Sequence, residues 1–105
     1  MARAKKLMDG SITAIASRCF DTFMIRCVVR DWPGGIPDVF LERVGYGDEA
    51  EPYPIEKQTK IRYSGERIHT LRFDEEGVHW VSDDQPWFVR VRADGSYAEK
   101  AIEDA

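Results

Sequence analysis

The two histidines, His69 and His79, are the residues in this chain best suited to proton transfer. A histidine that acts as a general base needs a partner within hydrogen-bond reach that orients its ring. In a catalytic arrangement, His69 would lie beside Trp87 at the mouth of a cavity, and Asp83 or Asp84 would orient it. These residue types occur in most proteins of this size. An enzyme that uses His69 is therefore one alternative, and no catalytic residue is assigned.

Motifs that identify a cofactor or a metal are missing from the sequence. It contains no P-loop, no dinucleotide-binding glycine pattern, no HExxH zinc motif, no calcium-binding loop and no nucleophile elbow. Cys19 and Cys27 lie in the other half of the chain from the histidines and lack the spacing of a zinc site. We expect no cofactor and no metal.

The second half of the chain has the clearest strand pattern. Residues 59–64, 67–73, 78–82 and 87–93 are short runs rich in β-branched and aromatic side chains. Sequences typical of turns separate them, at the spacing of β-hairpins. The pattern predicts an antiparallel meander.

The pairing of these strands can be tested for consistency. If Phe73 lies opposite Val78, and Ser82 lies opposite Trp87, both hairpins place their apolar residues on the same face. Because a slip by one residue would turn that set to solvent, the agreement supports the register. The predicted core face consists of Ile61, Tyr63, Leu71, Phe73, Val78, Trp80, Val89 and Val91. The same register puts His69 on the core face beside Ser82 and puts His79 on the opposite face, so the two should not share a metal ion.

The first half of the chain allows two interpretations. Residues 11–20 and 23–31 fit a β-hairpin, in which Cys19 would lie opposite Met24. Apolar residues in the first of these segments also fit a helical stripe, so a helix followed by a strand is the alternative. A further strand is predicted over 39–44, with a short helix that has Pro37 near its first turn as the alternative.

The segments after these strands are predicted as follows. Residues 45–54 should form a loop. After a turn at Asp94-Gly95, a last strand is expected over 97–102, with a short helix that begins at Ser96 as the alternative.

These elements predict a mainly β protein. About seven or eight short antiparallel strands should form a small barrel or a strongly curved sheet. If the first segment is helical, the class becomes α+β, with an N-terminal helix packed on the sheet. Residues 1–10 are expected to be a flexible basic tail, and residues 11–105 a single β domain.

Composition limits the class of protein. Hydrophobic residues make up 43% of the 105, as in globular proteins. The net charge of −4 argues against a nucleic-acid binder that uses its whole surface. Cys19 and Cys27 are expected to be free thiols in a reducing compartment, which favours the cytoplasm. No apolar run has the length of a signal peptide or a membrane span, so no membrane contact is expected.

The outward face of the meander collects basic and aromatic side chains. The predicted partner-binding face consists of Lys60, Arg62, Arg72, His79, Phe88, Arg90 and Arg92. Such a face can hold a phosphate backbone and stack a base, and it can equally hold an acidic protein. Ile68, Val81 and Phe88 form an apolar end of this face, which is the type of patch that a second subunit covers.

The sequence therefore favours a non-catalytic binding domain whose basic sheet face holds an anionic partner, either an acidic protein or a nucleic acid. Either a homo-oligomer would form through Ile68, Val81 and Phe88, or another segment of the chain would lie across them. The first alternative is a small barrel that binds an apolar or aromatic ligand. Its cavity would be lined by Tyr63, His69, Phe73, Trp80 and Trp87. The second alternative is the enzyme that uses His69.

Overall fold

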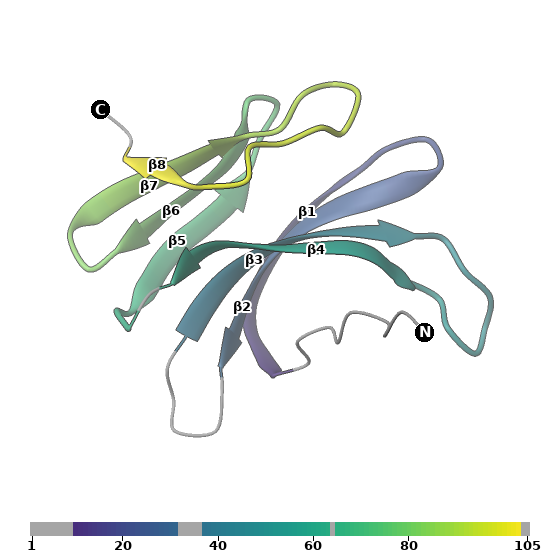
Figure 1. Cartoon of the computed structure of the whole chain (residues 1–105), viewed down its shortest axis with the longest axis horizontal. Helices are drawn as coiled ribbons and strands as arrows, with labels where there is room; N and C mark the ends of the chain where they lie inside the picture. Colours follow the sequence, from purple (N-terminus) through teal and green to yellow (C-terminus); the bar gives the residue numbers. More distant parts are fainter. Residues whose placement is uncertain (1–9, 32–36, 64, 104–105) are drawn as a thin grey trace, which may run out of the picture.

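The computed structural model describes residues 10–31, 37–63 and 65–103, and all of its regular elements are β-strands. Two antiparallel sheets of four strands each lie face to face (Figure 1). The first sheet has the order β1-β2-β3-β4 and the second the order β5-β6-β7-β8. The strand bounds are β1 Ser11–Cys19, β2 Phe23–Asp31, β3 Pro37–Gly45, β4 Ile55–Tyr63, β5 Ile68–Phe73, β6 Gly77–Ser82, β7 Gln85–Arg90 and β8 Ile102–Glu103.

The predicted mainly β class is confirmed, and the α+β alternative is wrong. The strands form two separate sheets, so neither a closed barrel nor one continuous curved sheet is seen in the described residues. The meander is interrupted between β4 and β5, where the chain passes from one sheet to the other. Face-to-face packing buries the apolar face of both sheets at once, which a single open sheet cannot do.

The first hairpin forms as predicted. β1 pairs with β2, and Cys19 lies opposite Met24. β3 and β4 continue this sheet antiparallel, and they are longer than the segments expected from the sequence. Residues 46–54 join β3 to β4 without a strand, in agreement with the predicted loop.

The core lies between the two sheets and is apolar. Its buried residues come from both sheets: Ile25, Cys27, Val29, Val39, Leu41, Ile61, Val78, Trp80, Val89 and Val91. Leu71 and Phe73 are partly buried and pack against this cluster, as the predicted core face requires. Tyr63 is an exception, because 66% of its surface is exposed. A register shift between β3 and β4 pairs Tyr63 with Asp38 and turns it away from the core.

The register of the second sheet differs from the prediction in one hairpin. Phe73 pairs with Val78 as expected, but Ser82 pairs with Gln85 rather than with Trp87. The turn is therefore the tight Asp83-Asp84 pair, in which Asp83 adopts a positive φ of 50°. Aspartate tolerates this left-handed conformation better than most residues. Because the shift is by two residues, every side chain keeps its predicted face.

A β-bulge in β5 reverses the predicted faces of two residues. The register shifts between His69 and Arg72, and Thr70 has a positive φ of 51°. As a result, His69 pairs with Val81 on the outer face, whereas Ile68 packs against the core. The extra residue of a bulge changes the face of every residue on one side of it.

The C-terminal segment contains less strand than predicted, and the alternative of a short helix is wrong. Val91 and Tyr97 form a single bridge around the Asp94-Gly95 turn, and only Ile102–Glu103 forms a strand. Gly95 has a φ of 83°, and a side chain there would collide with the ring of Phe23. The turn of the second sheet therefore packs directly against the first strand pair.

The same C-terminal segment also connects the two sheets. The Ala101 amide donates to the Ile61 carbonyl (3.1 Å), and Lys57 pairs with Glu99 (3.0 Å).

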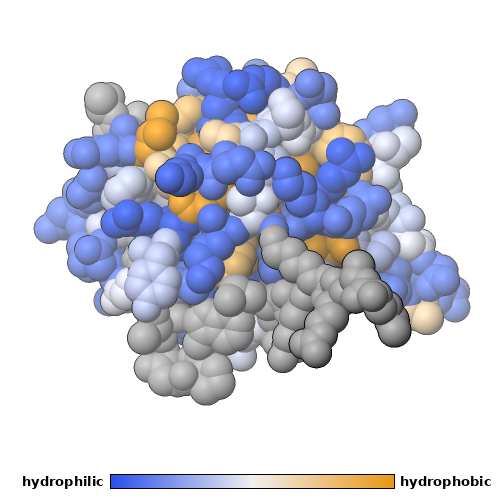
Figure 2. Space-filling view, viewed as in Figure 1, coloured by the Kyte–Doolittle hydropathy of each residue, from blue (hydrophilic) through white to orange (hydrophobic). Residues whose placement is uncertain are grey.

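No helix among the described residues is long and apolar enough to cross a membrane. In the view of Figure 2, polar side chains cover most of the surface, and apolar ones appear in small separate areas.

The two cysteines are free thiols with different exposure, which predicts different reactivity. Cys19 is exposed, whereas Cys27 is fully buried and its burial raises the pKa of its thiol. Because the thiolate is the reactive form, Cys27 should be inert in the folded protein. Titration with a chromogenic disulfide reagent should find one thiol in the native protein and two after unfolding. Rapid reaction of both thiols in the native state would contradict the packing of β2.

Trp80 is the largest fully buried side chain, at 1% exposure. Replacement by alanine removes its contacts with both sheets and leaves a cavity. Trp80→Ala should lower the free energy of unfolding by about 3–5 kcal/mol. Urea denaturation measures this change, and a loss below about 1 kcal/mol would show that Trp80 lies outside a packed core.

Candidate functional site: a basic recess at the end of β4

The residues of the predicted partner-binding face do not all lie on one surface. Arg72, His79 and Phe88 form a row across β5, β6 and β7 on the outer face of the second sheet. Lys60 and Arg62 lie on β4 in the other sheet. The remaining members are Arg90, at the end of β7, and Arg92, in the turn that follows.

Carboxylates offset part of the positive charge on the outer face of the second sheet. Asp74 pairs with both Arg72 and His79, and the Asp74–His79 distance is 3.0 Å. Burial opposes ionisation of Asp74, but the amides of Glu76 and Gly77 and the two basic side chains outweigh it, so the pKa of Asp74 falls to about 2. This carboxylate is therefore charged at neutral pH and reduces the attraction of this face for anions.

Asp74, Glu76 and His79 also form the one cluster of potential metal ligands found in the described residues. Their ligand atoms lie within 4.8 Å of one another. However, one oxygen of Asp74 accepts the two turn amides, and the other pairs with Arg72. A divalent cation would have to displace the Arg72 guanidinium, so these residues fit a turn better than a metal site.

A different surface has the chemistry of an anion site. A recess of about 360 Å³ lies where β4 meets the C-terminal segment, and we call it the basic recess. Its described lining consists of Lys60, Ile61, Arg62, Tyr63, Lys100 and Ala101. Three of these side chains are cationic and none is acidic.

Two backbone features bring these cations together. β4 supplies Lys60 and Arg62. A register shift between their partners Phe40 and Val39 turns the two side chains to different faces of β4, and both still line the recess at the end of this strand. The hydrogen bond from Ala101 to Ile61 then holds Lys100 beside β4. Residues almost forty positions apart in sequence therefore line one recess.

Arg62 is the best-placed anion donor in the basic recess. Its guanidinium lies 4.0 Å from the ring centre of Trp87, in a cation–π contact between the two sheets. Its Nε is buried and has no hydrogen-bond partner in the described chain. A guanidinium that stacks on a ring keeps its N–H groups directed along its edge, where a carboxylate or phosphate oxygen can accept them.

More buried donors without a partner lie around this contact. They are Nε1 of Trp80, Nε1 of Trp87 and the hydroxyl of Ser82, none of which has a hydrogen-bond partner among the described residues. Trp80 and Trp87 are paired across β6 and β7, and Ser82 lies two positions from Trp80. This part of the sandwich therefore contains several buried polar groups without a hydrogen-bond partner in the described chain.

Lys60 and Tyr63 form the outer side of the basic recess. The Lys60 ammonium lies 3.4 Å from the buried carboxylate of Asp38 and 5.5 Å from the ring centre of Tyr63. The 3.4 Å separation is longer than a strong charged hydrogen bond. The pair with Asp38 still keeps Lys60 beside the recess. The Tyr63 ring offers an exposed aromatic surface there.

The residues of the predicted ligand cavity are spread over the molecule. Trp80 lies in the packed core, Phe73 packs at its margin, and Trp87 is covered by Arg62. His69 lies on the outer face of the second sheet, and Tyr63 on that of the first. His69 and His79 thus share a face, contrary to the predicted register.

The predicted oligomer contact is also divided. Ile68 packs against the core, whereas Val81 and Phe88 remain on the outer face. Phe88 pairs with Ile102 of β8, which is 59% exposed. An apolar strip remains there, but Ile68 does not contribute to it.

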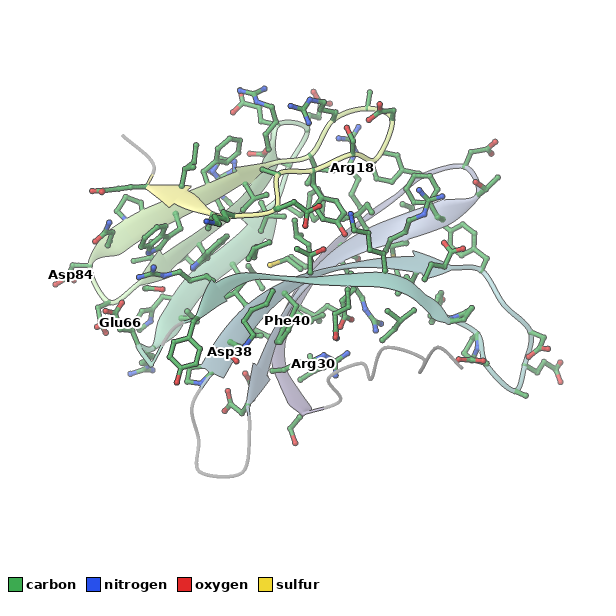
Figure 3. The ribbon with its side chains drawn as sticks, in the orientation of Figure 1. Arg18, Arg30, Asp38, Phe40, Glu66 and Asp84 are labelled. Carbon is green, nitrogen blue, oxygen red and sulfur yellow. The ribbon has the colours of Figure 1, made fainter. Side chains whose placement is uncertain are left out.

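Sequence reasoning missed a buried ionic cluster on the outer face of the first sheet. The Glu42 carboxylate is 0% exposed and accepts hydrogen bonds from Arg26 (2.8 Å), Arg30 (3.1 Å) and Gln58. Burial raises the pKa of Glu42, but these hydrogen bonds outweigh it and hold that pKa below its ordinary value of 4.5. Figure 3 shows Arg30, Asp38 and Phe40 on this side, away from the second sheet. The alternation of β2 and β3 would have placed these charges on one face, but it could not show that the face is buried.

Comparisons with known proteins add no functional information. No protein-family model matches the chain, and neither curated proteins nor solved structures give a significant match.

The ionic cluster predicts a large cost for removing the Glu42 charge. Glu42→Gln leaves Arg26 and Arg30 without their carboxylate partner and should cost about 3–5 kcal/mol of unfolding free energy. Glu56→Gln is the matched control, because Glu56 forms an exposed pair with Arg43 and should cost less than about 1 kcal/mol.

The same cluster predicts how stability depends on acid. Because the folded-state pKa of Glu42 is lowered, its contribution is complete above pH 4.5 and is lost as the pH falls below that value. Urea denaturation across this range should show a flatter acid limb for Glu42→Gln than for the wild type. Parallel acid limbs would contradict a charged Glu42.

Proposed function

We propose that this protein is a non-catalytic binding domain that holds an anionic group of a partner in the basic recess. The partner carries carboxylates or phosphates, as an acidic protein or a nucleic acid does. The observation that carries the proposal is the lining of the recess, which contains Lys60, Arg62 and Lys100 and no acidic side chain.

The charge arrangement supports this position over the outer face of the second sheet. There, Asp74 pairs with Arg72 and His79, so an anion would compete with a carboxylate already in place. At the recess, the Arg62 guanidinium stacks on Trp87, and neither Arg62 nor Lys100 forms an ion pair within the described residues. An anion that binds there does not have to displace a carboxylate from these two side chains.

The net charge of −4 limits the type of binding. A local basic site in an acidic protein favours anionic groups that fit the site and repels long polyanions elsewhere on the surface. We therefore expect moderate affinity that depends strongly on salt concentration. No ligand-binding barrel is proposed, because its predicted cavity residues lie apart.

Fluorescence anisotropy with two labelled probes tests the proposal. A short oligothymidylate represents single-stranded nucleic acid, and an oligoglutamate peptide represents an acidic protein. At least one should bind at low salt, and its affinity should fall steeply as salt rises, because cationic contacts release counterions or are screened. The probe that binds more tightly identifies the class of partner.

Charge reversal locates the site. Lys100→Glu should lower the affinity about tenfold, and Arg62→Gln should lower it similarly. Arg90→Glu is the matched control on the outer face of the second sheet, and it should change the affinity less than about twofold. Lys100 and Arg90 are both exposed, so either reversal should change stability by no more than about 0.5 kcal/mol.

Two results would overturn the proposal. If neither probe binds at low salt, the domain does not hold anions of either class. If Arg90→Glu abolishes binding and Lys100→Glu leaves it unchanged, the anion is held on the other face.

A further inference from the structure

A second recess, with the opposite chemistry, lies between the edges of the two sheets. It has a volume of about 440 Å³ and is formed by the first half of β1, the end of β2, the start of β3, and the start of β5 with the residues just before it. The residues that matter for its chemistry are Ala14, Val29, Asp31, Glu66, Arg67 and Ile68. We call it the Asp31 groove. Figure 3 shows Glu66 at this end of the sandwich.

Asp31 is the unusual residue of this groove. Its Oδ1 is buried and has no hydrogen-bond donor within the described part of the chain. A buried carboxylate oxygen without a donor is costly, because it has lost its water and gained no replacement. A cationic donor that enters the groove removes that cost.

The rest of the lining defines what such a donor should be attached to. Val29 belongs to the core, and Ala14 and Ile68 pack against it, so one wall of the groove beside Asp31 is apolar. Glu66 and Arg67 are exposed members of the same lining and carry opposite charges. The groove therefore combines a net negative charge with an apolar wall, and its volume suits a small ligand.

The geometry points to a binding site for a small organic cation, an ammonium group on a short alkyl chain. The ammonium donates to Asp31, and the alkyl chain lies against Ala14, Val29 and Ile68. This site is separate from the basic recess and does not depend on the proposed function.

A β-bulge in β1 beside the groove supports the proposed binding site. The register of β1 against β2 shifts between Ile12 and Ala14, which leaves Thr13 as the extra residue of a bulge beside the groove. The Thr13 hydroxyl lies 3.4 Å from the Val29 carbonyl, on the strand that carries Asp31. Bulges occur more often than expected next to binding sites, because they redirect side chains at a sheet edge.

Titration of the isotope-labelled protein with n-butylammonium, followed by amide NMR, tests the proposal. The amides of Ala14, Val29, Asp31 and Ile68 should shift together and saturate. Neutral 1-butanol has the same chain without the charge, and it should bind at least about tenfold more weakly. Butyrate, which carries the opposite charge, should cause no saturating shift at these amides.

Asp31→Asn keeps the size of the side chain and removes its charge. It should weaken n-butylammonium binding at least about tenfold, because the neutral amide cannot pair with the ammonium. Asp84→Asn is the matched control, since Asp84 is an exposed carboxylate at the same end of the sandwich. It should change binding less than about twofold.

The comparison among ligands on the wild-type protein stands even if Asp31→Asn fails to fold. Equal shifts with n-butylammonium and 1-butanol would show an apolar contact without recognition of charge, and they would overturn the proposal. Undiminished binding to folded Asp31→Asn would overturn it as well. Neither result bears on the basic recess, which is tested with anions.

Discussion

Burial of two apolar sheet faces against each other is the constraint on which the rest of this structure depends. Trp80 of β6 is 1% exposed and belongs to a core cluster to which both sheets contribute. Burial of a large aromatic side chain contributes a substantial part of the stability of so small a domain. Because both sheets must present their apolar face inward, every charged strand residue faces outward or lies at an edge.

This requirement explains where the charges are found. The centre of the first sheet places Glu42, Arg26 and Arg30 on the face away from the core, and they neutralise one another there. The cations of the basic recess lie instead at the end of β4 and in the C-terminal segment. The buried charges in the middle of the first sheet are therefore compensated, whereas Arg62 and Lys100, which form no ion pair within the described residues, lie at the end of β4 and in the C-terminal segment. Binding chemistry is expected at such positions, where side chains extend beyond a rigid scaffold.

The packing of the two apolar sheet faces also explains why the two recesses lie at the margins of the sandwich. The sheets are joined on one side by the contact of Ala101 with Ile61, and the basic recess opens there. The Asp31 groove opens between β1 and β5, which are close but not paired. The two proposed sites therefore differ in the charge of their linings.

The sequence by itself predicted most of the strands and the inward set of Val78, Trp80, Val89 and Val91, because side-chain alternation is a local property of the chain. It favoured the first hairpin but left a helix open for residues 11–20, since the apolar residues there also fit a helical stripe. It did not determine that the meander divides into two sheets, since apolar residues fit a barrel, a curved sheet or a sandwich equally well. The bulge at Thr70, which turned His69 outward and Ile68 inward, left no signal in the alternation. Only the tertiary structure placed Lys100 beside Arg62 and made Glu42 a buried carboxylate, because both depend on contacts between segments far apart in the chain.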